Sequence, residues 1–264
     1  MSALMKRVLT AVVFIPIVLG CLYWGGWAFF GLVLAVSLVA MFELRLMLNA
    51  MGSPVPGTVL YATSICLLAA IQWQKELWVS PIMFIAFLAV AIRELLSKTA
   101  RPFRRGGLTL LALFYGAFLP SHFLLLRGEA HGFELLLLVL LGTWATDTGA
   151  YFSGMRWGRH KLAPRISPSK SIEGAVGGLV AATIVIGCSD SFLQLQLQLL
   201  PVWILGLVIG LAAITGDLFE SALKREAGIK DSGWILPGHG GILDRIDSLL
   251  FTVPVFYYLV RWLG

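Results

Sequence analysis

The chain has 264 residues, of which 58% are hydrophobic and only 13% charged, and its formal net charge is +6. Its mean hydropathy of +0.87 lies far above the values of soluble globular domains. This composition excludes a soluble enzyme and a disordered chain. It predicts an all-α, polytopic membrane protein.

Nine hydrophobic segments follow one another along the chain, and each is a candidate membrane helix. They run over residues 9–24, 27–48, 59–73, 79–92, 108–126, 133–152, 175–189, 199–219 and 249–262. Several are shorter than the roughly 20 residues that cross a bilayer upright. We therefore expect about nine transmembrane helices, with eight as the alternative.

The basic residues predict how these helices are oriented, because Lys and Arg collect on the cytoplasmic side of a membrane. With the N-terminus inside, all but three of the 20 Lys and Arg residues face the cytoplasm. The exceptions are Lys75, Arg127 and Arg261. The same orientation places the polar segment 221–247 in the cytoplasm.

Four carboxylates are predicted to converge there. Asp147 and Asp217 lie near the cytoplasmic ends of two predicted helices, where ionisable residues usually face protein or water. Asp244 and Asp247 lie one helical turn apart in the segment 221–247. Their hard oxygens would suit Mg²⁺. The alternative for Asp147 and Asp217 is ordinary polarity at the ends of membrane helices.

The residues after Asp217 continue one helical face toward the cytoplasm. Ser221 follows at i+4, and the cations Lys224 and Arg225 follow at i+7 and i+8. Cations one to two turns from a carboxylate suit a phosphate-bearing ligand. Glu220 and Lys224 also form an i, i+4 pair, for which a surface ion pair is an equal alternative to a functional role.

A glycine-rich turn, Pro237-Gly-His-Gly-Gly241, precedes Asp244. Glycines allow successive N–H groups to point the same way, and the N-terminus of the following helix adds a positive dipole end. The turn therefore predicts an anion site, and His239 is the one histidine in a reactive setting.

A second cytoplasmic loop, residues 156–174, combines basic and hydroxyl side chains. Ser167 and Lys170 lie in a compact turn that feeds the next apolar segment, where they would suit phosphate or anionic lipid head groups. For Arg156 and Arg159, ordinary enrichment of cytoplasmic loops in basic residues is an equal alternative.

Metal-binding carboxylates, cations and an anion site at a membrane surface describe a place where two phosphorylated molecules meet. The segment 221–247 resembles, over its full length, the signature of the phosphatidate cytidylyltransferase (CDP-diacylglycerol synthase) family. Its pattern is Ser221-x-Leu-Lys-Arg-x(4)-Lys-Asp-x-Gly-x(2)-Leu-Pro-Gly-His-Gly-Gly-x-Leu-Asp-Arg-Ile-Asp247. The resemblance extends to residues 147–154, 167–174 and 216–217, whereas the first half matches only as a hydrophobic scaffold. One departure is Ser169, which stands where a second lysine is common.

The resemblance implies a nucleotidyltransferase of phospholipid biosynthesis, which converts CTP and phosphatidate to CDP-diacylglycerol and pyrophosphate. It implies Mg²⁺ as cofactor, with a second, monovalent cation left open. The metal ligands expected from it are Asp217, Asp244, Asp247 and, as a further candidate, Asp147. The catalytic residues expected are Asp217, Lys224, Arg225, His239 and Asp244. The substrate-binding residues expected are Ser167, Lys170, Ser221, Lys230, Asp231, Gly238, Gly240, Gly241 and Arg245.

The implied partners are CTP, phosphatidic acid, membrane lipid and a second copy of the chain, with no nucleic acid. We expect one integral membrane domain, residues 1–264, in which 1–132 is scaffold and 133–264 is the catalytic half, in a bacterial-type inner membrane with cytoplasmic catalytic loops.

Three alternatives have different signatures. A relative that uses a polyprenol or another lipid acceptor would share the same metal and nucleotide parts. A transporter should bind its substrate near the midplane of the membrane, on broken helices. The CDP-alcohol phosphotransferase class is disfavoured because its D-G-x(2)-A-R motif is missing from this sequence.

Overall fold

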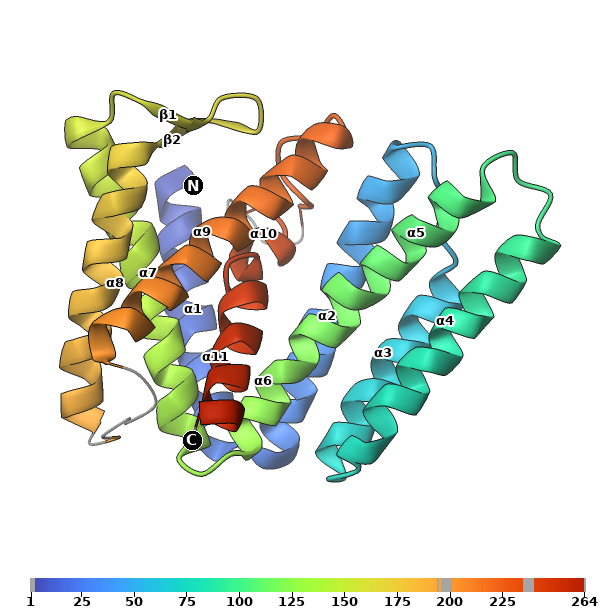
Figure 1. The fold of residues 1–264 in the computed structure, drawn as a ribbon, viewed down its shortest axis with the longest axis horizontal. Coiled ribbons are helices and arrows are strands. Elements are labelled where there is room, and N and C mark those ends of the chain that lie inside the picture. Colours follow the sequence, from blue (N-terminus) through green and yellow to red (C-terminus); the bar gives the residue numbers. More distant parts are fainter. Residues whose placement is uncertain (1–2, 194, 196–200, 235–239, 264) are drawn as a thin grey trace. The chain divides into compact units, whose positions relative to one another are not determined.

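The computed structural model describes residues 3–193, 195, 201–234 and 240–263, and helices make up most of it (Figure 1). Each of the nine predicted apolar segments coincides with a helix over its described residues. Among the described residues, six helices are long and apolar enough to cross a membrane. Two others, Val12–Trp24 and Gly57–Gln72, are apolar but shorter. The predicted helical, multi-pass membrane architecture is confirmed, and the count of nine spanning helices stays a prediction.

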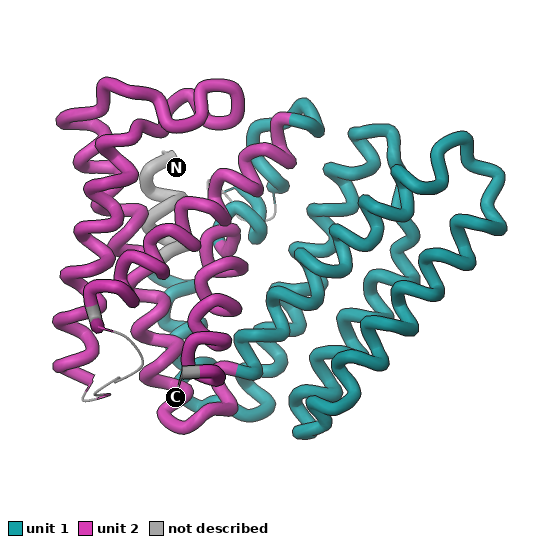
Figure 2. The backbone as a smooth tube through the Cα atoms, viewed as in Figure 1, with its two compact units in different colours: residues 1–125, 226–245 teal, residues 126–225, 246–264 magenta. Residues whose placement is uncertain are grey.

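The chain forms two compact units, which are coloured separately in Figure 2. Unit 1 comprises residues 1–125 and 226–245, so part of the polar segment 221–247 belongs with the N-terminal helices. Its elements are α1 (Ala3–Trp24), α2 (Gly26–Ala50), α3 (Gly57–Gln72), η1 (Glu76–Trp78), α4 (Val79–Leu96), α5 (Pro102–Leu113), η2 (Phe114–Phe118), most of α6 (Leu119–Gly128) and most of α10 (Leu243–Ile246).

Unit 2 comprises residues 126–225 and 246–264. Its elements are the end of α6, α7 (Gly132–Trp157), β1 (Lys161–Ala163), β2 (Ser167–Ser171), α8 (Ile172–Leu193), α9 (Val202–Glu226) up to Arg225, and α11 (Leu249–Leu263). The two strands pair antiparallel, with Lys161 opposite Ser171 and Ala163 opposite Ser167. The predicted scaffold half (1–132) and catalytic half (133–264) stay a prediction.

A π-helical turn lies inside the helix of unit 1 that runs from α5 to α6. This turn, η2, contains Gly116, whose carbonyl accepts a hydrogen bond of 2.6 Å from the buried hydroxyl of Ser37 in α2. A β-carbon at Gly116 would lie 2.8 Å from the Met41 methyl group. The glycine therefore lets α2 approach the irregular turn closely, and Ser37 bonds a backbone carbonyl there.

Small residues join α7 to α8 in unit 2. A β-carbon at Gly178 would lie 2.7 Å from the Thr146 carbonyl oxygen, and one at Gly149 would lie 2.5 Å from the Ala181 β-carbon. Such contacts let membrane helices pack backbone to backbone. Gly178 of α8 therefore packs against α7 within the chain.

Candidate functional site

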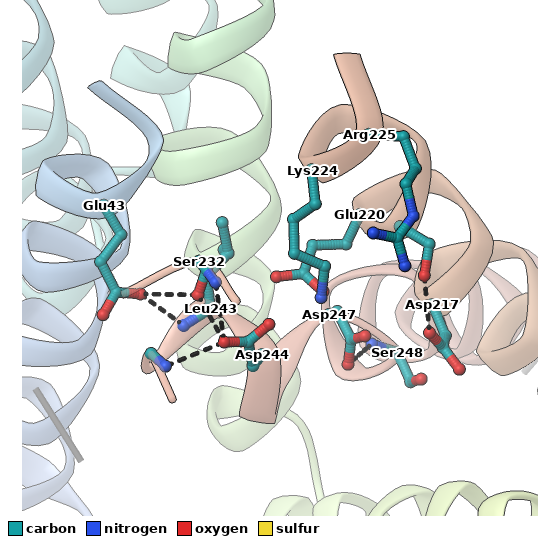
Figure 3. A network of polar contacts seen from close by, with 12 residues as sticks. Glu43, Asp217, Glu220, Lys224, Arg225, Ser232, Leu243, Asp244, Asp247 and Ser248 are labelled. Carbon is teal, nitrogen blue, oxygen red and sulfur yellow. Dashed lines mark hydrogen bonds and ion pairs between the residues drawn. The ribbon is translucent and has the colours of Figure 1, made fainter. Parts of the chain in front are cut away.

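The polar side chains drawn in Figure 3 belong to two groups, one in each compact unit. The group in unit 1 consists of Glu43, Ser232, Asp244 and the backbone that leads into α10. The group in unit 2 consists of polar residues of α9 and β2 and of Asp247 and Ser248, which precede α11. The predicted metal ligands are accordingly divided, with Asp244 in unit 1 and Asp147, Asp217 and Asp247 in unit 2.

Asp244 accepts hydrogen bonds from the loop that precedes α10. Its Oδ2 atom accepts hydrogen bonds from the Ser232 N–H (2.9 Å), the Ser232 hydroxyl (2.9 Å) and the Gly241 N–H (2.8 Å). The last of these is a cap, because it satisfies an N–H group just before α10. The carboxylate thus joins two parts of the loop, one from each side of residues 235–239.

Glu43 of α2 is a second, fully buried carboxylate of this group. Its Oε1 accepts from the Ile242 N–H (3.0 Å), and its Oε2 accepts from the Leu243 N–H (2.8 Å) and the Ser232 hydroxyl (3.3 Å). Glu43 is not among the residues that were predicted for the site. An acidic side chain inside an apolar segment was the available signal, because such residues are costly without partners.

The described part of the glycine-rich turn faces these carboxylates. Gly240 has φ +80°, a left-handed conformation that favours glycine. The N–H of Gly241 is donated to Asp244, as described above. Gly238 and His239 lie outside the described residues, so their predicted roles have no structural counterpart here.

Asp217 of α9 and Asp247 are neighbours in unit 2, although they are far apart in the sequence. Lys170 of β2 forms an ion pair of 2.6 Å with Asp217, and the Ser221 hydroxyl lies 3.4 Å from the same carboxylate. A β-carbon at Gly216 would lie 2.5 Å from the Asp247 carbonyl oxygen, so the glycine permits this approach of α9. The structure therefore brings together four residues that the sequence assigned to the site.

The surroundings of Asp247 in unit 2 disfavour its ionised form. Burial and then the nearby carboxylate of Asp217 raise the pKa of Asp247 to about 7, with a smaller contribution from Asp147. The Ser248 N–H, which donates to Asp247 at 2.7 Å, and the charge of Lys224 act in the opposite direction. The ionised Asp247 is therefore under-compensated, and a bound cation would stabilise it.

Glu220 is buried and its partner Lys224 partly buried, so this ion pair does not lie at the surface. The Lys224 Nζ lies 2.5 Å from the Glu220 Oε2, and the Glu220 side chain is 0% exposed. The expectation of a surface ion pair is corrected accordingly, because the helical face that carries Glu220 points into the protein. Breaking such a buried pair usually costs about 3–5 kcal/mol.

The hairpin of β1 and β2 supplies the other basic contacts. Ser167 is buried, and the Arg225 Nε donates to the Ile166 carbonyl at 3.2 Å, which ties the end of α9 to the hairpin. Glu173, which was not among the predicted site residues, accepts from the N–H groups of Arg159 (3.0 Å) and His160 (3.2 Å).

Three of the predicted substrate-binding residues are exposed in the described structure: Lys230, Asp231 and Arg245.

The donor set suits a cation that needs few protein ligands. Among the residues that the structure describes, no three His, Cys, Asp or Glu side chains are arranged to hold a metal ion. Mg²⁺ is commonly held by only one or two carboxylates and completes its shell with water and substrate phosphates. Asp217 and Asp247 fit that requirement.

The raised pKa of Asp247 predicts a pH-dependent stability difference. Because the folded-state pKa exceeds the value of about 4 in an unfolded chain, the associated stabilisation is complete below pH ~4 and is lost as the pH rises through about 7. In chelator-containing buffer, Asp247→Asn should therefore stabilise the protein more at pH 8 than at pH 5. The gain in the free energy of unfolding should differ between the two pH values by an amount on the order of a few kcal/mol, and the rise in unfolding temperature should be larger at pH 8. Thermal unfolding in detergent measures this, and an equal shift at both pH values would contradict it.

Comparisons with known proteins show the family to which the chain belongs. The model of the cytidylyltransferase family matches residues 5–263. A Staphylococcus haemolyticus (strain JCSC1435) protein named phosphatidate cytidylyltransferase is 35% identical over 258 residues, which cover 96% of this chain and 98% of that protein. A Bacillus subtilis (strain 168) protein of the same name is 34% identical over 260 residues and 97% of each chain. With similarity of this extent, the chain belongs to the cytidylyltransferase family.

Proposed function

We propose that the chain is a phosphatidate cytidylyltransferase, a nucleotidyltransferase that transfers CMP from CTP to phosphatidate and releases pyrophosphate. The observation that carries the proposal is the meeting of Asp217, Asp247 and Lys170 in unit 2, from three separate segments. The relatives of the same family that bear this enzyme name support the choice of substrates.

We propose Asp217 and Asp247 as the primary ligands of Mg²⁺, with Asp244 and Asp147 as further candidates and a second, monovalent cation as an open possibility. The fit rests on the under-compensated charge of Asp247 beside a second carboxylate. When bound, Mg²⁺ would neutralise charge on the CTP phosphates.

The basic residues of the site would bind and orient the phosphates. Lys170 and Lys224 are partly buried cations next to carboxylates, so each is positioned rather than loosely solvated. Arg225 is exposed and fixed to the hairpin through its Nε. These cations would hold the phosphatidate and the triphosphate with their charges neutralised, which is the main requirement of nucleotidyl transfer. Ser167, Ser221, Lys230, Asp231, the turn residues Gly238, His239, Gly240 and Gly241, and Arg245 remain proposed substrate contacts.

The proposed transfer needs no strong base. A phosphate monoester has a second pKa near ~6, so the attacking oxygen of phosphatidate is already ionised at neutral pH. That oxygen forms a bond to the α-phosphorus of CTP, the bond from the α-phosphorus to the bridging oxygen breaks, and pyrophosphate leaves with the electron pair.

The cellular setting is proposed as a bacterial inner membrane with the catalytic loops in the cytoplasm. The lopsided distribution of Lys and Arg supports this orientation. We also propose that the chain forms a homodimer, on the basis of the family resemblance.

Purified protein in detergent should incorporate tritiated CTP into CDP-diacylglycerol only when both phosphatidate and Mg²⁺ are present. Omitting phosphatidate or adding EDTA should abolish incorporation, because one removes the acceptor and the other the metal. Thin-layer chromatography of the lipid product measures this. Incorporation into a polyprenyl phosphate but not phosphatidate would change the acceptor, and no incorporation with any lipid would contradict nucleotidyl transfer.

Asp217→Asn and Asp247→Asn should each lower CMP transfer by about a hundredfold or more, because each removes a charge that positions the metal and nucleotide. Glu129→Gln is the matched control, since Glu129 is a carboxylate of unit 2 that pairs with Arg261 at 3.6 Å, outside the proposed site. The control should retain activity within about twofold. Near-normal turnover by Asp217→Asn would remove Asp217 from the proposed metal site.

A further inference from the structure

A buried carboxylate holds the polar segment of unit 1. Glu43 lies in α2, which is one of the candidate membrane spans, and it is 0% exposed. An acidic side chain at such a place is costly unless donors surround it. Its donors are the Ile242 N–H, the Leu243 N–H and the Ser232 hydroxyl, and all three belong to the segment 226–245.

Two glycines of the same segment lie so close to this carboxylate that neither position has room for a side chain. A β-carbon at Gly233 would lie 2.5 Å from the Glu43 Oε1, and one at Gly241 would lie 2.5 Å from the Glu43 Oε2. Neither distance is compatible with an ordinary contact, so any larger residue would displace the carboxylate or the loop. In this structure, the anions that the N–H groups of residues 241–243 bind are therefore two carboxylates of the protein itself, Asp244 and Glu43.

Ser232 couples this carboxylate to Asp244. The Ser232 hydroxyl lies 2.9 Å from the Asp244 Oδ2 and 3.3 Å from the Glu43 Oε2. It has one hydrogen, so it donates to one carboxylate at a time. A change at Glu43 therefore reaches Asp244 through Ser232 (Figure 3). It also acts on the N–H groups of Ile242, just before α10, and of Leu243, the first residue of α10.

We infer that Glu43 is a positioning residue for the transfer reaction, which fixes the Asp244 carboxylate by holding Ser232 and the residues 241–243. The inference rests on the proposed function, because Asp244 is one of the proposed signature carboxylates. It assigns a role in the reaction to α2, which the sequence analysis treated as scaffold.

The test uses full-length protein in detergent, with Glu43→Gln, Glu43→Asp and the matched control Glu94→Gln. Glu94 is also a buried carboxylate of unit 1, but its oxygens accept from the Arg105 side chain at 2.8 and 3.0 Å. Amide hydrogen exchange at residues 241–243 is measured without substrate. The half-saturating Mg²⁺ concentration and kcat are measured for CMP transfer.

Glu43→Gln should speed exchange at residues 241–243 by about tenfold and raise the half-saturating Mg²⁺ concentration several-fold, because an amide offers one acceptor oxygen to donors that now share two. Glu43→Asp keeps the carboxylate and should recover part of both effects. Glu94→Gln should change neither quantity, because its partner is the Arg105 side chain and not the segment 226–245.

Wild-type exchange and Mg²⁺ dependence in Glu43→Gln would overturn the inference. The same changes in Glu94→Gln would also overturn it, because the effect would then belong to any buried carboxylate of unit 1. If the wild-type protein transfers no CMP, the proposed function fails, whereas the exchange rates still decide whether Glu43 holds the segment.

Discussion

The hydrogen bonds between the Glu43 carboxylate and the segment 226–245 are the constraint on which the polar part of unit 1 depends. The carboxylate is buried in a helix that is apolar enough to span a membrane, so its charge requires donors. The Ile242 and Leu243 N–H groups supply them, and Gly233 and Gly241 lack the side chains that would prevent the approach. The loop conformation and the buried charge therefore stabilise each other.

The carboxylates of unit 2 are in a different electrostatic situation. In unit 1, one oxygen of Asp244 accepts from two backbone N–H groups and from the Ser232 hydroxyl, which Asp244 shares with Glu43. In unit 2, by contrast, the pKa of Asp247 is raised to about 7 by burial and by the charge of Asp217. Lys170 offsets part of the negative charge through its ion pair with Asp217. A site of this kind costs stability when no cation is bound and gains affinity for one, which is a common compromise at functional sites.

Much of this arrangement could be predicted from the sequence. Apolar runs are a strong signal because every backbone group in a membrane must bond internally, and all nine runs coincide with helices over their described residues. The approach of Asp217 to Asp247 followed from placing both near the same membrane surface. The burial of Glu220 did not follow, because i, i+4 spacing says nothing about which face of α9 is covered.

The division into two compact units and the role of Glu43 also lay beyond the sequence patterns. Both depend on contacts between residues nearly 200 positions apart, such as Glu43 with Leu243, which no local periodicity reports. The glycine turn illustrates the same limit. Its composition predicts N–H groups that face an anion, but Gly241 faces Asp244, and the residues after it face Glu43.

The most direct test of the central claim compares CTP labelled with ³²P at the α-phosphate with CTP labelled at the γ-phosphate, using purified protein, phosphatidate and Mg²⁺. Transfer of CMP predicts that the lipid product carries label from the α-phosphate alone and that the γ-label is released as pyrophosphate. Lipid labelled from the γ-phosphate would show phosphoryl transfer instead and would contradict the account.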